Sequence, residues 1–311
     1  MSVVVIGDAN VDLEIRLPQH HLAAAHANPE PRMFGGGSAA NTAAALARMG
    51  TDCRFVGGVG DDDYGRFATA SLAEAGVDVG SIVTTTEAPT VMVIVAVPPV
   101  GDRLIYVWPP RGGAHGELHV AAAVASVASA QWLHVSGICL RVSPAREAVV
   151  AAMERANADS VPVSFDLNLR LENWGWDDGF RSVVDAAAAR ADVVLGAAYD
   201  EIVPLAGLDD PVEAATSLAG DDRLVIARLG RDGAVACSAA GAVRASGFEV
   251  DVVDTVGAGD AFSAGFIAAR MRSLELTEAL RWGNAVAALS VAQPGARSTP
   301  TIHEVEAILA G

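Results

Sequence analysis

"TVGAGDAFSAGF", residues 255–266, places a glycine-rich turn directly before a predicted helix. The first turn of a helix presents unpaired backbone N–H groups and the positive end of the helix dipole, and glycine leaves them unobstructed. Residues 257–259 are therefore a candidate anion-binding turn. The next residue, Asp260, is itself an anion, which is consistent either with a helix cap or with a base that accepts a proton.

Small residues continue along the first turns of this helix, where Ala261, Ser263, Ala264 and Gly265 leave room for a large ligand. Phosphoryl transfer needs N–H donors aimed at the transferred group and a base beside the attacking hydroxyl. A glycine turn followed by a carboxylate fits both requirements. Phosphoryl transfer is therefore one function that this stretch favours.

The rest of the chain alternates apolar strands with amphipathic helices, which is typical of a mostly parallel sheet covered on both faces. We expect one α/β domain over residues 1–311, with a three-layer α/β/α core. A hairpin, a further strand and three helices complete the chain. The predicted strands are 2–8, 53–59, 132–137, 161–166, 192–196, 223–229 and 248–253, and the hairpin is 223–238. A glycine turn feeds a helix within 35–50, helical stretches are expected over 199–219, and the other helices are 64–75, 144–156, 178–190, 259–272, 277–292 and 300–310.

Two segments interrupt this alternation. Residues 11–17 alternate apolar and polar side chains, while 91–97 and 104–108 flank a turn as the strands of a hairpin do. We expect them to form a small β-sheet inserted in the core, a lid made of about 11–31 and 88–112. Such a sheet could close the site or serve as the face of a homodimer.

The composition excludes several classes of protein. A formal charge of −17 argues against sequence-independent binding of nucleic acid, and the lack of lysine excludes a lysine Schiff base and a GxxxxGK[ST] phosphate loop. No apolar run of about 18 residues is present, so we expect a cytoplasmic protein without a membrane span. The three cysteines lie far apart in apolar stretches, which indicates buried free thiols rather than disulfides or a metal site. They are Cys53, Cys139 and Cys237.

Two long motifs carry a resemblance to a known family. "DTVGAGDAFSAGF" (254–266) is similar to the C-terminal signature of the ribokinase-like, or PfkB, carbohydrate kinases. "GGGSAANTAAALARMG" (35–50), followed by "VGGVGDDDYG" (56–65), resembles their N-terminal signature. The resemblance implies a ribokinase-like fold and ATP-dependent, Mg²⁺-assisted phosphorylation of a primary hydroxyl of a small sugar or sugar acid. It implies Asp260 as the general base and Gly257, Ala258 and Gly259 as the anion hole.

The resemblance also implies residues for the sugar. The segment "GDANVDL" (7–13) and the first glycine motif match positions that hold sugar hydroxyls, which are Asp12, Gly36, Gly37 and Asn41. "DLNLR" (166–170) is similar to fructokinase-like and 2-keto-3-deoxygluconate kinase-like members. By this match Arg170 contacts a phosphate or a substrate carboxylate, and Arg111 in "WPPRGGA" is a second candidate for a sugar acid.

For the nucleotide, the resemblance implies one residue near the transferred phosphate and four around the base and the turn. Arg228 replaces the lysine that the family usually has before the turn. The implied residues are Asn168, Arg228, Gly230, Gly233 and Asn284.

The metal positions depart most from the family pattern. The expected N-x-x-E stretch is "GAAYDE" (196–201), so either Asp200 or Glu201 is the candidate for hydrated Mg²⁺. Asp254, with the backbone around Gly295, is a candidate for a monovalent cation such as K⁺.

The sequence favours a 2-keto-3-deoxygluconate-like acid or fructose as substrate, because of "DLNLR". A ribose or nucleoside kinase is the alternative within the same fold. A non-catalytic sugar or nucleotide sensor is the competing class, although a sensor has no need of a base at Asp260.

Overall fold

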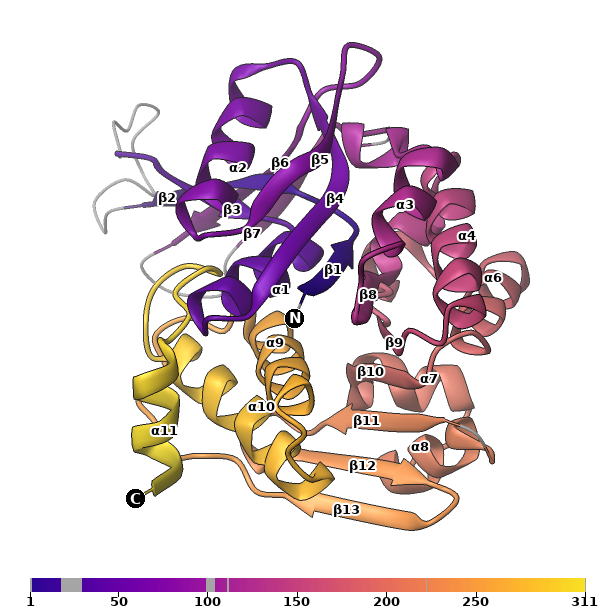
Figure 1. Cartoon of the computed structure of the whole chain (residues 1–311). Helices are drawn as coiled ribbons and strands as arrows, with labels where there is room; N and C mark the ends of the chain where they lie inside the picture. Colours follow the sequence, from indigo (N-terminus) through magenta and orange to yellow (C-terminus); the bar gives the residue numbers. More distant parts are fainter. Residues whose placement is uncertain (1, 18–29, 99–103, 111, 222, 311) are drawn as a thin grey trace.

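A computed structural model describes residues 2–17, 30–98, 104–110, 112–221 and 223–310. Within them the core is a nine-stranded sheet between two layers of helices (Figure 1), which confirms the predicted α/β fold class. Strands β1, β4, β5 and β8 to β11 are parallel, and β12 and β13 add an antiparallel edge. In spatial order the strands are β13 (Gly241–Ala245), β12 (Ala234–Ser238), β11 (Leu224–Arg228), β10 (Val193–Ala197), β9 (Val163–Asp166), β8 (Trp132–Ser136), β1 (Ser2–Ile6), β4 (Asp52–Gly60) and β5 (Asp78–Thr85).

Alternate strand residues face the two helical layers. In β1, Val4 and Ile6 belong to one buried core and Val3 and Val5 to the other. A parallel strand buried on both sides is therefore apolar along its whole length. The layer around Val3 contains α1 (Ser38–Arg48), α2 (Asp63–Glu74), α9 (Ala258–Met271), α10 (Leu276–Val291) and α11 (Ile302–Ala310), and the layer around Val4 contains α3 (Val120–Val127), α4 (Ala145–Ala158), α6 (Asp178–Ala188), α7 (Val203–Ala206) and α8 (Pro211–Ala219).

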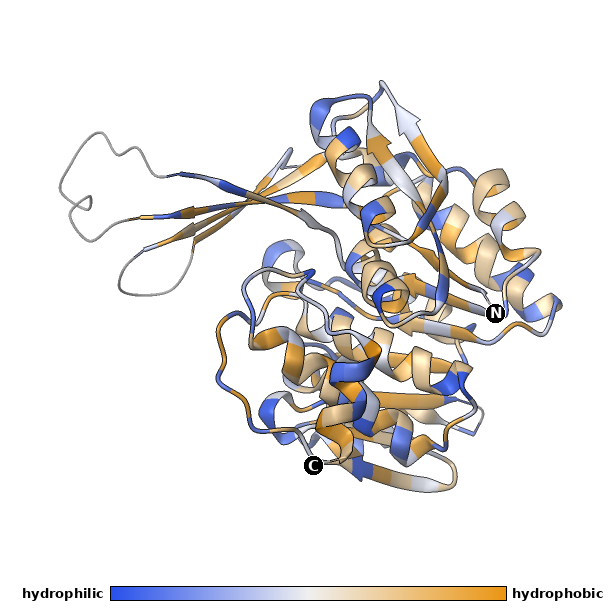
Figure 2. Cartoon of the chain, turned by 60° about the vertical axis from the view of Figure 1, so that its left-hand side comes forward, coloured by the Kyte–Doolittle hydropathy of each residue, from blue (hydrophilic) through white to orange (hydrophobic). Residues whose placement is uncertain are grey.

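A second, four-stranded sheet projects from the core (Figure 2). Its strands β6 and β7 pair antiparallel, as the hairpin pattern predicts, and β2 pairs with β6 in parallel. The edge strand β7 exposes every one of its side chains, Leu104 to Trp108. In spatial order the strands are β3 (Arg32–Gly36), β2 (Asn10–Arg16), β6 (Val91–Val97) and β7 (Leu104–Trp108).

Short helical segments connect several of these elements. The helical stretches predicted over 199–219 are separate segments, because Gly207 ends α7 in the left-handed conformation, with φ of 69°, before α8 begins. The short segments are η1 (Ala114–Glu117), η2 (Gly137–Arg141), α5 (Leu171–Trp174), η3 (Ala198–Ile202) and η4 (Gly230–Asp232).

The strand predicted over 248–253 is wrong. This segment is irregular, and the sheet edge next to β12 is taken by β13 instead. The N–H of Val253 donates to Val291 O (2.8 Å) at the end of α10, and the Val252 and Val253 side chains are exposed. An alternating pattern predicts a strand only where a neighbouring strand has room to pair with it.

All three cysteines are buried and free. In the described part of the chain, no helix is both long enough and apolar enough to cross a membrane.

Candidate active site

The glycine turn opens α9 at the carboxyl-end side of the parallel strands. Gly257 adopts φ of 79°, and a Cβ at this position would lie 2.5 Å from Ala296 O. Both the left-handed backbone and the close approach of the 295–298 loop therefore require glycine at Gly257. The N–H of Ala258 closes the turn with a long bond to Thr255 O (3.3 Å).

Asp260 lies on the first turn of α9, but its side chain does not cap this helix. Its carboxylate instead accepts hydrogen bonds from α1, through Ser38 Oγ (2.6 Å) and Asn41 Nδ2 (2.9 Å). Burial raises the pKa of Asp260 to about 7, while these two donors act to lower it. A carboxyl group that titrates near neutral pH is well suited to accept a proton from a hydroxyl.

The residues expected around the sugar come together beside α1. Asp12 on β2 accepts a hydrogen bond from Asn10 Nδ2 (3.1 Å), and burial raises the pKa of Asp12 to about 6. Gly36 on β3 has no room for a side chain, because a Cβ would collide with the Asp12 carboxylate. Gly37 adopts φ of 97° against Asp8 O as the chain enters α1. The small sheet and the start of α1 thus bring Asp12, Gly36, Gly37 and Asn41 to the same side of Asp260.

Arg297 belongs to the same cluster, although no sequence motif predicted it. Its guanidinium donates to Asn41 Oδ1 (Nε, 3.2 Å), Ser71 Oγ (Nη1, 2.8 Å) and Gly36 O (Nη2, 2.8 Å). Arg297 lies in the loop between α10 and α11, where an arginine usually faces solvent, so only the folded chain brings it to Asn41. The sequence gives one indication of a role for Arg297, which is that it directly follows Ala296 and Gly295, the residue expected near a monovalent cation.

Asp8 was also missed. Its carboxylate accepts from the first N–H groups of α1, at Ser38 N (2.9 Å) and Ala39 N (3.3 Å). This contact fixes the helix end that carries Ser38 and Asn41, the two donors to Asp260.

Arg228, expected near the nucleotide, forms a buried ion pair. It grips Asp166 with both terminal nitrogens (2.6 and 2.8 Å), and Nη1 also donates to Gly259 O (3.1 Å). Ser263 Oγ donates to the same Asp166 carboxylate (2.7 Å). Burial alone would lower the pKa of Arg228. The charge and hydrogen bonds of Asp166, together with the nearby charges of Glu201 and Asp260, outweigh burial and raise it. Arg228 and Asp166, another residue that sequence analysis missed, therefore hold the first turn of α9 against the ends of β9 and β11.

The two turn glycines and Asn284 are neighbours. Gly230 and Gly233 adopt φ of 63° and 92°, and a Cβ on Gly233 would collide with Ala245 O. Asn284 on α10 donates through Nδ2 to Ala245 O (2.9 Å) and Ser246 O (3.1 Å). The turn, the 245–246 backbone and α10 thus form one continuous surface.

Asn168 and Arg170 follow β9 in left-handed conformations, with φ of 42° and 49°. Among the residues that the structure describes, Nδ2 of the buried Asn168 has no hydrogen-bond partner. Arg170 is exposed, and its charge acts to lower the pKa of Asp260. Arg111 lies outside the described residues.

The metal candidates differ in their surroundings. Both carboxylate oxygens of the buried Glu201 accept backbone N–H groups, from Leu169 (2.7 Å) and Ala197 (2.8 Å), whereas Asp200 is exposed. Asp254 accepts from Val256 N (3.0 Å) and Gly295 N (3.1 Å), so it joins the loops on both sides of Gly257. Within the described ranges, no three acidic, histidine or cysteine side chains converge as metal ligands do.

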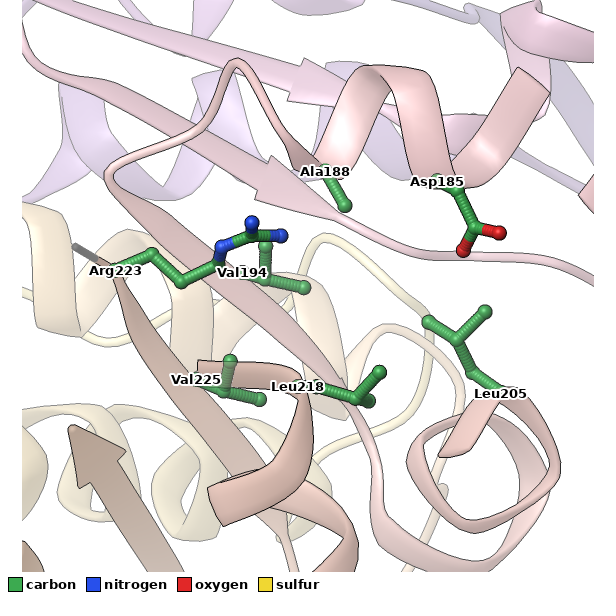
Figure 3. Close-up of a pocket in the computed structure, with 7 residues that line it drawn as sticks. All are labelled: Asp185, Ala188, Val194, Leu205, Leu218, Arg223 and Val225. Carbon is green, nitrogen blue, oxygen red and sulfur yellow. The ribbon is translucent and has the colours of Figure 1, made fainter. Parts of the chain in front are cut away.

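Two cavities lie in different parts of the molecule. One, of about 220 Å³, is adjacent to the residues expected around the sugar and includes Arg297 and Ser71 in its lining. The other, of about 200 Å³, lies among α6, α7, α8 and the first residues of β10 and β11 (Figure 3), at the strand ends opposite to Asp166 and Arg228. It contains none of the candidate site residues. Its lining is Asp185, Ala188, Val194, Leu205, Leu218, Arg223 and Val225.

Comparison with known proteins assigns this arrangement to a family. The family model described as pfkB family carbohydrate kinase matches residues 1–302. The chain belongs to this family. It is a sugar kinase, which confirms the predicted resemblance and the predicted ATP-dependent phosphorylation of a sugar.

Three curated relatives illustrate the range of the family. The chain is 35% identical to the ATP-dependent ribose-1-phosphate kinase of Halopiger xanaduensis, over 99% of this chain and 98% of that protein. It is 34% identical to the aminoimidazole riboside kinase of Salmonella typhimurium, over 95% and 90%. It is 34% identical to a fructokinase of Klebsiella pneumoniae, over 86% and 83%. The relatives therefore agree on the reaction and differ in the sugar.

Solved structures agree with the fold. The fructokinase of Xylella fastidiosa with bound ATP superposes with a TM-score of 0.87 at 26% identity, over 99% of this chain and 98% of that one. The ribokinase of Thermotoga maritima gives 0.82 at 25% identity, over 99% of both chains.

Proposed function

We propose that this kinase phosphorylates a primary hydroxyl of a small sugar or sugar acid, with Asp260 as the general base. The observation that carries the proposal is the buried Asp260 carboxyl, whose pKa is about 7, directly after a glycine turn at a helix N-terminus. Asp260 would take the proton of the attacking hydroxyl. The N–H groups of Gly257, Ala258 and Gly259 would stabilise the charge on the transferred phosphoryl group.

The sugar would lie between the small sheet and α1. Asp12 and Asn41 offer paired acceptors and donors to vicinal hydroxyls. Gly36 leaves room for the Asp12 carboxylate, and Gly37 lets the chain pass close to Asp8 O as it enters α1. Because Asn41 also donates to Asp260, a sugar held here would present its hydroxyl beside the base.

ATP would lie along the surface formed by Gly230, Gly233 and Asn284, with its phosphates toward the glycine turn. The buried, unpartnered Nδ2 of Asn168 supports this orientation, because a phosphate oxygen would satisfy it. Arg228 would support the anion hole indirectly, because its hydrogen bond to Gly259 O holds Gly259 in place.

Residues that could hold cations differ in how well they fit. The exposed Asp200 suits a hydrated Mg²⁺ better than Glu201, whose oxygens both accept backbone N–H groups. When bound with ATP, Mg²⁺ neutralises phosphate charge. Asp254, joined to Gly295, would hold a K⁺ ion next to the anion hole.

The small sheet would act as a lid over the sugar and as the face of a homodimer. We propose one domain over residues 1–311, with the lid formed by about 11–31 and 88–112. The run of exposed apolar side chains on the edge strand β7 supports this role, because such an edge favours pairing or burial.

The test of the proposed function is ADP release over a panel of sugars. We expect turnover of fructose, 2-keto-3-deoxygluconate, ribose, adenosine or ribose 1-phosphate, with ³¹P NMR locating the new phosphate on a primary carbon. The "DLNLR" motif favours the first two, while the names of the relatives bring ribose 1-phosphate and a riboside into the panel. Nucleotide binding without turnover of any of them would contradict the proposal and favour a sensor.

A further inference from the structure

The guanidinium of Arg297 is a partly buried cation whose hydrogen-bond acceptors, within the described part of the chain, are all neutral. These are the amide oxygen of Asn41, the hydroxyl of Ser71 and the carbonyl of Gly36. Among the residues that the structure describes, no carboxylate oxygen lies within 4 Å of it as an ion-pair partner. A desolvated charge without a counter-ion is unfavourable, and proteins usually resolve it with a paired charge or a ligand.

Nearby acids do not supply that counter-ion. Asp12, Asp260 and Asp8 attract Arg297 at longer range, but each has hydrogen-bond donors of its own. Burial outweighs their attraction and lowers the pKa of Arg297 to about 10. The fold therefore leaves the guanidinium electrostatically unsatisfied.

The cavity beside Arg297 gives this charge access to a ligand. It holds about 220 Å³ and combines apolar walls with a few polar groups, as ligand sites commonly do. Gly35 makes room for the guanidinium, because a Cβ there would collide with Nη1 of Arg297 and lie 2.6 Å from Ser71 Oγ. The lining residues are Met33, Phe34, Gly35, Phe67, Ser71, Gly295, Arg297 and Ser298.

Arg297 is also close to the reacting end of the site. Nε donates to one end of the Asn41 amide, and the other end of that amide donates to Asp260. A single amide group thus separates the guanidinium from the base. A five- or six-carbon sugar is long enough to touch both.

We propose that Arg297 binds an anionic group of the sugar substrate, a carboxylate or a phosphate remote from the hydroxyl that is phosphorylated. This inference rests on the proposed function, because it takes Asp260 as the position of the attacking hydroxyl. A guanidinium suits either anion, since its N–H groups match two oxygens at once. Arg297 would then select acidic sugars, the role that sequence analysis gave to Arg111 and Arg170.

The alternative is that Arg297 only ties β3, α1 and α2 together. Arg48 provides a matched control, because it donates to Thr299 O (2.9 Å) and anchors the same loop without lining the cavity. A structural tie would affect neutral and anionic sugars alike, whereas an anion subsite affects their ratio.

The experiment measures equilibrium binding to the full chain without nucleotide, by calorimetry, for two matched pairs of sugars. Ribose 1-phosphate is compared with ribose, and 2-keto-3-deoxygluconate with its neutral counterpart 3-deoxyfructose. We expect one anionic sugar to bind at least about tenfold more tightly than its partner, and the pair that responds identifies phosphate or carboxylate. In R297M the affinity for that anion should fall on the order of 30-fold and the ratio should approach one. R297K should keep part of the preference and R48M all of it.

Equal binding within both pairs, no binding of either anion, or a ratio unchanged in R297M would overturn the subsite. An equal loss for both members of a pair in R297M would do the same and favour the structural tie. If R297M does not fold, R297K and the wild-type ratio decide. Binding without nucleotide is independent of turnover, so a preserved ratio with no ADP release would sink the proposed function and leave the subsite standing.

Discussion

Arg228 and Arg297 both lie close to Asp260, but their charges are compensated to different extents. Arg228, at the end of β11, has Asp166 as a bidentate partner, and its pKa is raised. Arg297, in the loop after α10, has neutral partners, and burial lowers its pKa. The difference indicates that the Arg228 charge is completed within the fold, while the Arg297 charge is left for a ligand.

The largest effect is expected from breaking the ion pair between Arg228 and Asp166. R228M leaves the Asp166 carboxylate buried with Ser263 as its remaining side-chain donor, so we expect a loss of about 3–5 kcal/mol of unfolding free energy. Urea denaturation measures it. The double variant R228M/D166N removes the Asp166 charge and should recover part of the loss, but not all of it, because the buried Glu201 carboxylate (3.7 Å from Arg228 Nη2) also loses its ion-pair partner. A loss below about 1 kcal/mol in R228M would show that the pair is not the main support of the α9 turn.

The second largest effect is expected at Asp260, the carboxylate that lies close to both arginines. D260N keeps the shape of the side chain but cannot accept the proton, so we expect kcat to fall by at least about 10². The affinity for ATP should be nearly unchanged, because Asp260 faces Ser38 and Asn41 on α1. Steady-state kinetics and nucleotide titration measure the two quantities. D185N, an exposed carboxylate beside the other cavity, serves as the control, and near-normal turnover in D260N would rule out Asp260 as the base.

The pH dependence of kcat/KM tests how α1 tunes this base. Asp260 acts when deprotonated, so activity should rise with pH through about 7 and then level off. The Asn41 amide stabilises the ionised form, so N41L should raise the pKa of Asp260 and move the rise to higher pH, by about one unit. S38A should move it in the same direction. A shift to lower pH, or none in either variant, would contradict this account of the Asp260 pKa.

The region around Arg228 is more predictable from the sequence than the region around Arg297, for a physical reason. The α9 turn and Asp260 are contiguous in the chain, and the strand that carries Arg228 follows from its apolar pattern. Arg297 reaches Asn41 across 256 positions, and no local pattern predicts such a contact. The Asp166 partner was missed for the same reason, because the parallel sheet alone brings the ends of β9 and β11 together.

The strand wrongly predicted at 248–253 has the same cause, because it too depends on tertiary packing. Its alternation of side chains is real, but pairing depends on a free neighbour, and β13 already occupies the edge. Periodicity therefore predicted most of the strands and helices, while the contacts that give site residues their chemistry depend on tertiary packing. Asp260 shows this most clearly, since the sequence left both a helix cap and a base open and only the contacts to α1 distinguish them.

The smallest expected effect completes the comparison. R297M loses three hydrogen bonds to neutral groups but also removes a desolvated charge, so the two terms should nearly cancel. We expect its unfolding free energy in urea to lie within about 1 kcal/mol of the wild type, close to that of R48M. A matched anionic sugar at 100 times its Kd should then stabilise the wild type by about 2.7 kcal/mol and R297M far less. A loss in ligand-free R297M as large as in R228M would mean that both charges are completed within the fold, and the contrast between the two regions would disappear.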